Sequence, residues 1–229
     1  MSSENCKKIL FGEGNLTIED IVNVSKSQDP VALSQAEDFK ERIDAGVRFL
    51  DKILKEEGHI YGVTTGYGDS VMFEVPLDLV EELPMHLTRF HGCGLGDFFT
   101  PEQSRAILAT RLASLSRGYS GVSWNLLDLL VELLNRNILP VIPEEGSVGA
   151  SGDLTPLSYV AGTLIGERDT YYKGEIVQAS EAFEKEGLKP IKLRPKEGLA
   201  VMNGTAVMAA LACTAYKRAE YATKLMARI

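Results

Sequence analysis

The sequence predicts a mainly α-helical fold with one small β-hairpin. Two helix-start signals each precede a stretch in which apolar residues recur at helical spacing. A third stretch is apolar on nearly every side, which is typical of a helix at the centre of a large core. Strand signals are few, and the sequence has no internal repeat or low-complexity tract. The fold class therefore rests on the helices, and any unusual chemistry is expected in the loops.

The first helix signal is Ser-Gln-Ala-Glu at residues 34–37, which has the form of a capping box. The apolar face that follows it, up to a stop at Gly58, is made of Phe39, Ile43, Val47, Leu50 and Leu54. The second signal is Thr-Pro-Glu-Gln at residues 100–103, which combines a cap, a proline in the first turn and a glutamine at the reciprocal position. That helix is predicted to continue to Gly118. A third, central helix is predicted over roughly residues 124–135.

The second half of the chain predicts two further helices and the hairpin. Residues 154–165 are an apolar, helix-like run, and residues 171–177 predict a hairpin with Lys173-Gly174 as its two-residue turn. From Thr205 onward apolar residues recur at helical spacing to the last residue, and no Gly, Asn or Pro ends the helix there. This pattern predicts that the chain is a piece of a longer protein. We expect an N-terminal arm over residues 1–15 and one body over residues 16–229.

Composition narrows the class of protein. The 229 residues are 45% hydrophobic, which allows a substantial core, and the net charge of −8 argues against nucleic acid as a partner. The N-terminus lacks the apolar stretch of a signal peptide, and no later segment is expected to span a membrane. The three cysteines, Cys6, Cys93 and Cys213, lie far apart, and only three histidines are present. We therefore expect a cytoplasmic protein with reduced thiols and no metal site.

Residues 146–153, Gly-Ser-Val-Gly-Ala-Ser-Gly-Asp, form a small-residue loop ahead of a predicted helix. A phosphate-binding loop is disfavoured because no Lys-Ser/Thr pair follows, and a nucleophilic serine is disfavoured because Ser151 is not in Gly-x-Ser-x-Gly. By spacing alone, a glycine-rich turn in which Asp153 caps the next helix is favoured. A different chemistry is open to Ala150-Ser151-Gly152. If the Gly152 nitrogen adds to the Ala150 carbonyl and two waters are lost, Ser151 becomes an electrophilic methylidene group.

Three other clusters combine glycines with polar or aromatic residues. Residues 61–69 place three glycines between and beside two tyrosines, and Tyr61 could serve as a general base, although a flexible loop with packed tyrosines is the simpler interpretation. In residues 89–96, His91 either lines a pocket or is satisfied structurally. In residues 199–205, Asn203 interrupts an apolar helical stretch, which predicts either a helix break or an amide that serves a site.

The order of these motifs resembles the aromatic amino acid ammonia-lyase and aminomutase family. Three blocks carry the resemblance: Tyr-Gly-Val-Thr-Thr-Gly-Tyr-Gly at 61–68, Gly-Ser-Val-Gly-Ala-Ser-Gly-Asp-Leu-Thr-Pro-Leu at 146–157, and Glu-Gly-Leu-Ala-Val-Met-Asn-Gly-Thr at 197–205. The likeness runs from about Leu16 to the end. It implies a mainly α, ammonia-lyase-like fold in which this chain supplies the start of a central long-helix bundle.

The resemblance also implies a prosthetic group and residue roles. Ala150, Ser151 and Gly152 would become 4-methylidene-imidazol-5-one (MIO), flanked by Gly149 and Asp153 as supports. Tyr61 would remove the β-proton of the substrate, and Asn203 would support the site near the MIO carbonyl. Family members are mainly helical homotetramers whose active sites draw residues from more than one subunit. Site residues that the family places further along are absent from this chain.

The resemblance implies a substrate class as well. The pair Phe90-His91 would face the side chain of an aromatic L-amino acid. In the family this pair tracks substrate preference, and Phe-His matches no typical pair. The surrounding residues look closest to those of bacterial tyrosine 2,3-aminomutase-like members. We therefore expect elimination of ammonia from tyrosine or histidine, with a tyrosine 2,3-aminomutase or an inactive fragment of such an enzyme as alternatives.

Overall fold

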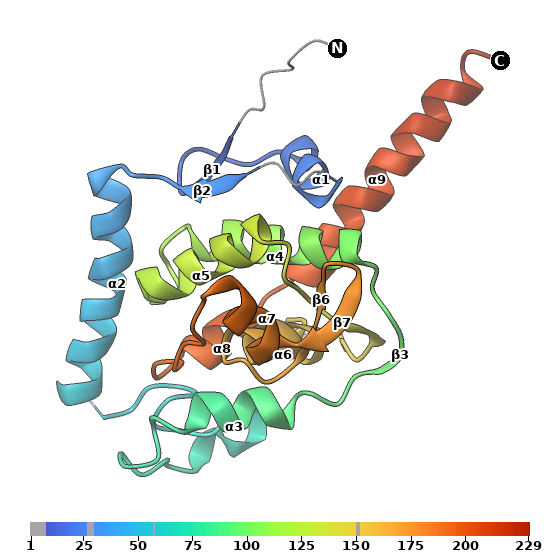
Figure 1. Ribbon diagram of the computed structural model, residues 1–229. Coiled ribbons are helices and arrows are strands. Elements are labelled where there is room, and N and C mark those ends of the chain that lie inside the picture. Colours follow the sequence, from blue (N-terminus) through green and yellow to red (C-terminus); the bar gives the residue numbers. More distant parts are fainter. Residues whose placement is uncertain (1–7, 27–29, 57, 150–151) are drawn as a thin grey trace.

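The computed structural model describes residues 8–26, 30–56, 58–149 and 152–229. Its helices confirm the predicted fold class, and they surround a core that is centred on α4 and α5 (Figure 1). The helices are α1 (Ile18–Lys26), α2 (Glu37–Glu56), α3 (Leu83–Phe90), α4 (Pro101–Leu115), α5 (Trp124–Asn135), α6 (Leu154–Leu164), α7 (Ala179–Glu186), α8 (Glu197–Met202) and α9 (Ala206–Met226), with a short 3₁₀ helix η1 (Gly68–Met72).

Short strands between the helices form small sheets of two or three strands. The strands are β1 (Ile9–Phe11), β2 (Val31–Leu33), β3 (Leu95–Phe98), β4 (Leu139–Pro140), β5 (Pro143–Glu145), β6 (Asp169–Tyr172) and β7 (Glu175–Gln178). β1 pairs in parallel with β2, and β3 pairs antiparallel with β5. The predicted hairpin is the β6–β7 pair, and it is extended to three strands by β4, which pairs antiparallel with β6. Thr170 and Tyr172 are buried, so one face of this sheet packs on the core.

The central helices form where local signals are strong. α4 begins with the predicted capping box, in which the Thr100 hydroxyl accepts a hydrogen bond from Gln103 N and the Gln103 side chain accepts one from Thr100 N. α5 spans the predicted residues, and its leucines at positions 126, 127, 130 and 133 have no exposed surface. α4 also packs against α1, α5 and α9. It is therefore the helix through which these parts of the core are joined.

The capping box predicted at Ser34 is wrong. α2 begins at Glu37, and the Ser34 hydroxyl donates instead to the Glu13 carboxylate while it accepts from Ala36 N. Ser34 N also donates to Phe11 O, which extends the pairing of β1 and β2. Ser34 therefore bonds to residues about 20 positions earlier in the chain. A capping signal, which considers only four consecutive residues, does not predict such contacts.

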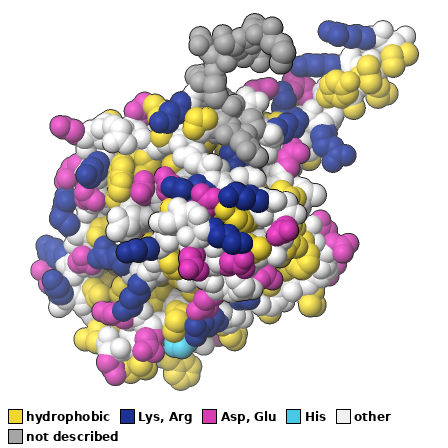
Figure 2. Space-filling view, viewed as in Figure 1, with side chains coloured by type: hydrophobic (Ala, Val, Ile, Leu, Met, Phe, Trp, Pro, Cys, Tyr) yellow, Lys and Arg dark blue, Asp and Glu magenta, His cyan; other side chains and the backbone are white. Residues whose placement is uncertain are grey.

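The expectation that no segment could span a membrane was also too strong. Within the described residues, Glu197–Met226 is long and apolar enough to cross a membrane by length and composition, although only this one stretch meets the criterion. It is weak evidence, since the stretch is broken at residues 203–205 and its first part lies in the core. Beyond Ala210 the helix extends from the body, and hydrophobic side chains lie along its free end (Figures 1 and 2).

Candidate active site

The small-residue loop of residues 146–153 connects β5 to α6. Gly149 has φ +64°, and a Cβ there would meet no atom within 4 Å, so glycine is favoured by the backbone conformation and not by lack of space. Gly146, by contrast, is packed against the Thr155 side chain. Ala150 and Ser151 lie outside the described residues. The loop can therefore be placed through its two flanks, at Gly149 and at Gly152.

Gly152 packs against the break between α8 and α9. A Cβ added to it would lie 2.7 Å from Gly204 N and 3.1 Å from Asn203 Nδ2. The next residue reinforces this contact, because Asp153 N donates to Gly204 O at 2.7 Å. Only glycine fits at position 152, and its neighbour across the contact is the predicted Asn203. The fold thus brings together two motifs that are far apart in the sequence.

Asp153 caps α9 and not α6. Its Oδ2 accepts hydrogen bonds from Val207 N at 3.0 Å and Met208 N at 3.2 Å, and its Oδ1 accepts one from the Ser147 hydroxyl at 2.8 Å. No side-chain cap is formed at the start of α6, so the predicted cap on the next helix is wrong. The carboxylate is 3% exposed and neutralises the positive end of α9, which begins beside Asn203.

Asn203 ends α8, and its peptide N donates to Leu199 O at 2.8 Å. The residue is exposed, so the helix break was correctly anticipated and the amide is not buried. The side chain therefore links the buried Gly152, which lies beside its Nδ2, to the solvent, from which a bound molecule could reach it. An Asn amide both donates and accepts, which suits a carboxylate or a ring carbonyl.

Sequence reasoning missed Arg111. The guanidinium is 4% exposed, and its Nη2 donates to Ala200 O and, at 3.2 Å, to Asn203 O. Burial lowers the pKa of Arg111 to about 10, and the negative charge of Asp153 opposes that shift. The signal available in the sequence was an arginine in a stretch of α4 that is otherwise made of small and apolar residues.

Tyr61 lies in the loop before η1 and is 52% exposed. Its phenol oxygen accepts a hydrogen bond from Gly68 N at 3.0 Å, and its ring meets the Tyr67 ring edge-to-face with centroids 6.3 Å apart. Burial, together with the nearby Tyr61, raises the pKa of Tyr67 to about 12. A Cβ at Gly62 would lie 2.7 Å from Leu199 Cδ2, so this loop packs on α8, the helix that ends at Asn203.

Phe90 and His91 lie at the end of α3, a helix that packs against α6 and α8. Phe90 is 79% exposed, and the two rings meet edge-to-face with centroids 5.2 Å apart. His91 is half-buried, and its Nδ1 lies 3.1 Å from Leu87 O. The next turn is attached to α6 by a hydrogen bond from Gly94 N to the Tyr159 phenol at 3.2 Å. The predicted residues thus come from segments that pack around α6 and α8.

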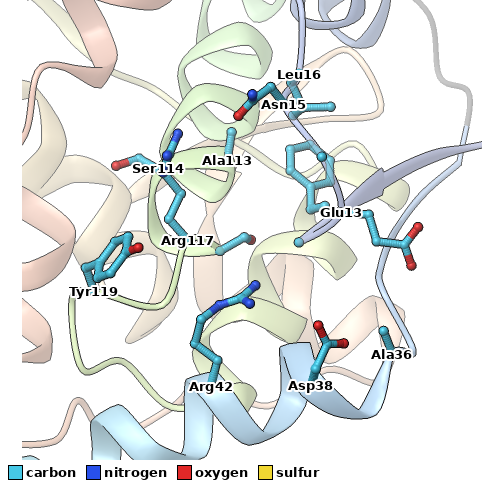
Figure 3. Close-up of a pocket in the computed structure, with 14 residues that line it drawn as sticks. Glu13, Asn15, Leu16, Ala36, Asp38, Arg42, Ala113, Ser114, Arg117 and Tyr119 are labelled. Carbon is cyan, nitrogen blue, oxygen red and sulfur yellow. The ribbon is translucent and has the colours of Figure 1, made fainter.

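A cavity of about 740 Å³ lies elsewhere, between residues 11–16, the start of α2 and the end of α4 (Figure 3). None of the described site residues lines it. In the part of the chain that the structure describes, no three His, Cys, Asp or Glu side chains are grouped so that they could hold a metal ion. The fold and the loops around α6 and α8 define a helical protein whose candidate site centres on a small-residue turn and the N-terminus of a long helix.

The comparisons place this helical protein in a family. Residues 16–229 match the family described as aromatic amino acid lyase. The histidine ammonia-lyase of Caldanaerobacter subterraneus subsp. tengcongensis is 42% identical over 207 residues, which cover 90% of this chain and 40% of that protein. Human histidine ammonia-lyase is 40% identical over 214 residues, covering 93% of this chain and 32% of that protein. The chain belongs to the aromatic amino acid lyase family.

Solved structures agree with this assignment. Ergothionase from Treponema denticola, an ergothioneine-degrading enzyme, superposes with a TM-score of 0.89 at 33% identity, covering 93% of this chain and 42% of that one. Tyrosine aminomutase from Streptomyces globisporus superposes with a TM-score of 0.82 at 36% identity, covering 90% and 38%. The chain therefore spans about two fifths or less of the length of most of these relatives.

Proposed function

We propose that this chain carries the electrophile-forming part of an MIO-dependent ammonia-lyase, or related aminomutase, that acts on an aromatic L-amino acid. The observation that supports it best is the contact of Gly152 with Asn203 and Gly204. It joins the tripeptide 150–152 to the polar helix break that the family resemblance links with the prosthetic group. On the two flanks of the tripeptide, Gly149 has a positive φ, and Asp153 is anchored by the Ser147 hydroxyl.

The residues of this loop fit the formation of MIO. In that reaction the Gly152 nitrogen bonds to the Ala150 carbonyl carbon, that carbonyl oxygen leaves as water, and the Ser151 hydroxyl leaves with its α-hydrogen as the second water. No oxidant is needed. A side chain at position 152 would collide with Gly204 N, and the hydrogen bond from Asp153 N to Gly204 O holds the turn on its far side. Such restraint favours attack between atoms that are already close.

MIO supplies an electrophile for the substrate amino group, which no ordinary side chain provides. The chain itself would remove the β-proton through Tyr61. The Gly68 N–H donates to the Tyr61 oxygen at 3.0 Å and so holds this phenol in place, while burial raises the pKa of Tyr67 to about 12. Of this pair of phenols, Tyr61 is therefore the one that we propose as the base. Its exposure leaves it accessible to a substrate.

We propose that the ring of the substrate bears a polar group, as in tyrosine or histidine. The His91 Nδ1 lies 3.1 Å from Leu87 O, and a neutral imidazole that donates there presents Nε2 as an acceptor. A phenol O–H or an imidazole N–H could donate to that nitrogen, whereas phenylalanine has no such donor. The exposed Phe90 ring beside it offers an apolar contact for the substrate ring. Equal kcat/KM for phenylalanine, tyrosine and histidine would contradict this specificity.

The aminomutase is the second candidate. Two solved relatives with that printed name, a tyrosine aminomutase and a phenylalanine aminomutase, superpose with TM-scores of 0.82 and 0.85. Both reactions begin with the same loss of ammonia, and the mutase returns it to the β-carbon. Product analysis separates them, because the lyase gives an unsaturated acid and free ammonia, whereas the mutase gives a β-amino acid.

We also propose a cytoplasmic homotetramer with active sites shared between subunits. The far part of α9 exposes large apolar side chains that a neighbouring subunit or further chain could cover, among them Tyr216, Tyr221 and Met226. Light scattering coupled to size-exclusion chromatography would test the assembly. A monomer with full activity would contradict the shared sites.

Intact-mass spectrometry tests the central proposal. We expect the chain to be lighter by two waters, and we expect peptide mapping to place the loss at residues 150–152. The variant Ser151→Ala is the matched control, because it lacks the hydroxyl that leaves and should keep its full calculated mass. The wild-type chain is measured alone and again when it is fused to the C-terminal part of a full-length family member. If it keeps its full mass in both forms, MIO formation is refuted.

A further inference from the structure

Arg111 projects from the middle of α4 toward the α8–α9 break. Its guanidinium donates to Ala200 O and Asn203 O, two carbonyls at the C-terminal end of α8 that lack partners within that helix. Nη1 also lies 3.5 Å from the Ser114 hydroxyl. The planar guanidinium can bond two carbonyls at once, which a lysine ammonium does with less geometric constraint. Arg111 thus fixes the backbone on which Asn203 sits.

The guanidinium also lies directly against Gly204. A Cβ built on Gly204 would overlap Nη1 and would come within 2.9 Å of Cζ. On its other side, Gly204 N lies 2.7 Å from a Cβ built on Gly152, and Gly204 O accepts from Asp153 N at 2.7 Å. The peptide at Gly204 is therefore held between Arg111 and residues 152–153, with no space for it to retreat.

The charges of Arg111 and Asp153 also favour this arrangement. The carboxylate of Asp153 is close enough to favour the charged form of Arg111, and with a pKa of about 10 the guanidinium is charged at neutral pH. In the described part of the chain, Arg111 Nε is buried and makes no hydrogen bond. Burying this cation with one unsatisfied N–H costs free energy that a purely apolar side chain would avoid. A role in the site would account for that cost.

We infer that Arg111 is a positioning residue for ring formation: by binding the Ala200 and Asn203 carbonyls, it holds Gly204 against Gly152 and so fixes the position of the Gly152 nitrogen. The inference rests on the proposed function of the tripeptide 150–152. The contacts described for Arg111 are with Ser114 and the α8–α9 break, so its effect on the loop passes through Gly204.

The test compares Arg111→Lys with Arg105→Lys. Arg105 is a matched control because it lies on the same helix, is 3% exposed, and donates to the backbone carbonyls of Val24 and Leu134, away from the loop. Each chain is synthesised in a cell-free system, and the two-water mass loss is followed over time. We expect Arg111→Lys to slow that loss by about 10- to 100-fold, as expected for misplaced reacting atoms. We expect Arg105→Lys to leave its rate unchanged. Equal rates in wild type and Arg111→Lys, or equal slowing in both variants, would overturn the inference.

Amide hydrogen exchange distinguishes this inference from the proposed function. In Arg111→Lys the amides of Asp153, Val207 and Met208 should exchange at least about 10-fold faster, since the Gly204–Asp153 contact opens more often, while they stay protected in Arg105→Lys. If the wild type loses no water, the proposed function fails. If the exchange of these amides in Arg111→Lys equals that in the wild type, the positioning role is overturned, whatever the mass shows. If Arg111→Lys does not fold, Gly204→Ala displaces the guanidinium from the opposite side, and normal ring formation in that variant would overturn the inference.

Discussion

Asp153 offers a direct test of the packing around the candidate site. Its carboxylate is buried and accepts two backbone hydrogen bonds from α9 and one from the Ser147 hydroxyl. Alanine at this position removes the N-cap and leaves both amides and the hydroxyl without that acceptor. An N-cap contributes up to about 2 kcal/mol, and unsatisfied buried donors cost about 1–3 kcal/mol more. We therefore expect Asp153→Ala to lower the free energy of unfolding by about 3–4 kcal/mol.

Asp153→Asn separates hydrogen bonding from charge. The Asn Oδ1 can still accept from Val207 N and Met208 N, and its Nδ2 can donate to the Ser147 hydroxyl oxygen. Only the charge at the N-terminus of α9 and opposite Arg111 is lost, which costs about 1–2 kcal/mol. The two variants should therefore differ by roughly 2 kcal/mol, the contribution of the cap itself.

Urea unfolding followed by circular dichroism measures these differences, and thermal melts give a second reading. A loss of about 3 kcal/mol should lower the Tm of a chain of this size by about 6–12 °C. Asp20→Ala is the control, because Asp20 accepts two hydrogen bonds from Thr17 at an exposed helix start and should cost less than about 1 kcal/mol. An Asp153→Ala variant within about 0.5 kcal/mol of wild type would refute the reasoning. Equal losses in Asp153→Ala and Asp153→Asn would show that charge, and not the cap, accounts for the effect.

Three further predictions concern the core and the tyrosine pair. Leu130→Ala should lower the free energy of unfolding by about 2–5 kcal/mol, measured from urea midpoints, because Leu130 is fully buried, whereas Leu79→Ala at a half-exposed site should change it little. The folded chain holds the Tyr67 proton more tightly than the unfolded chain, since its pKa is about 12 and not 10. Stability is therefore lost as pH rises from about 10 to about 12, and urea midpoints across that range should fall less steeply for Tyr67→Phe; parallel slopes would contradict this. Tyr61→Phe should lower turnover by the complete enzyme at least about 100-fold while the two-water mass loss is unchanged, because the phenol acts on the substrate and not on the ring.

Local sequence signals were sufficient for the central helices and insufficient for the connections. The range 124–135 matches α5 because its dense leucines lie within a few turns of one another. α1, α3 and the three-residue strands β1 and β2 were not anticipated, since elements this short show little periodicity. β1 and β2 also pair across the whole of α1 and are stabilised by burial of Phe11 and Leu33 in the common core.

The sequence by itself determined which chemistry we propose for this chain. A serine between two small residues, a tyrosine beside flexible glycines and an asparagine in an apolar stretch are properties of residue type and order, and they are visible without a fold. Tertiary structure alone decided that Asp153 caps α9, that Arg111 lies behind Gly204, and that Gly152 meets Asn203. These are contacts between segments distant in the chain, and they form because α8 packs against both α6 and α4, which brings the loops at their ends together.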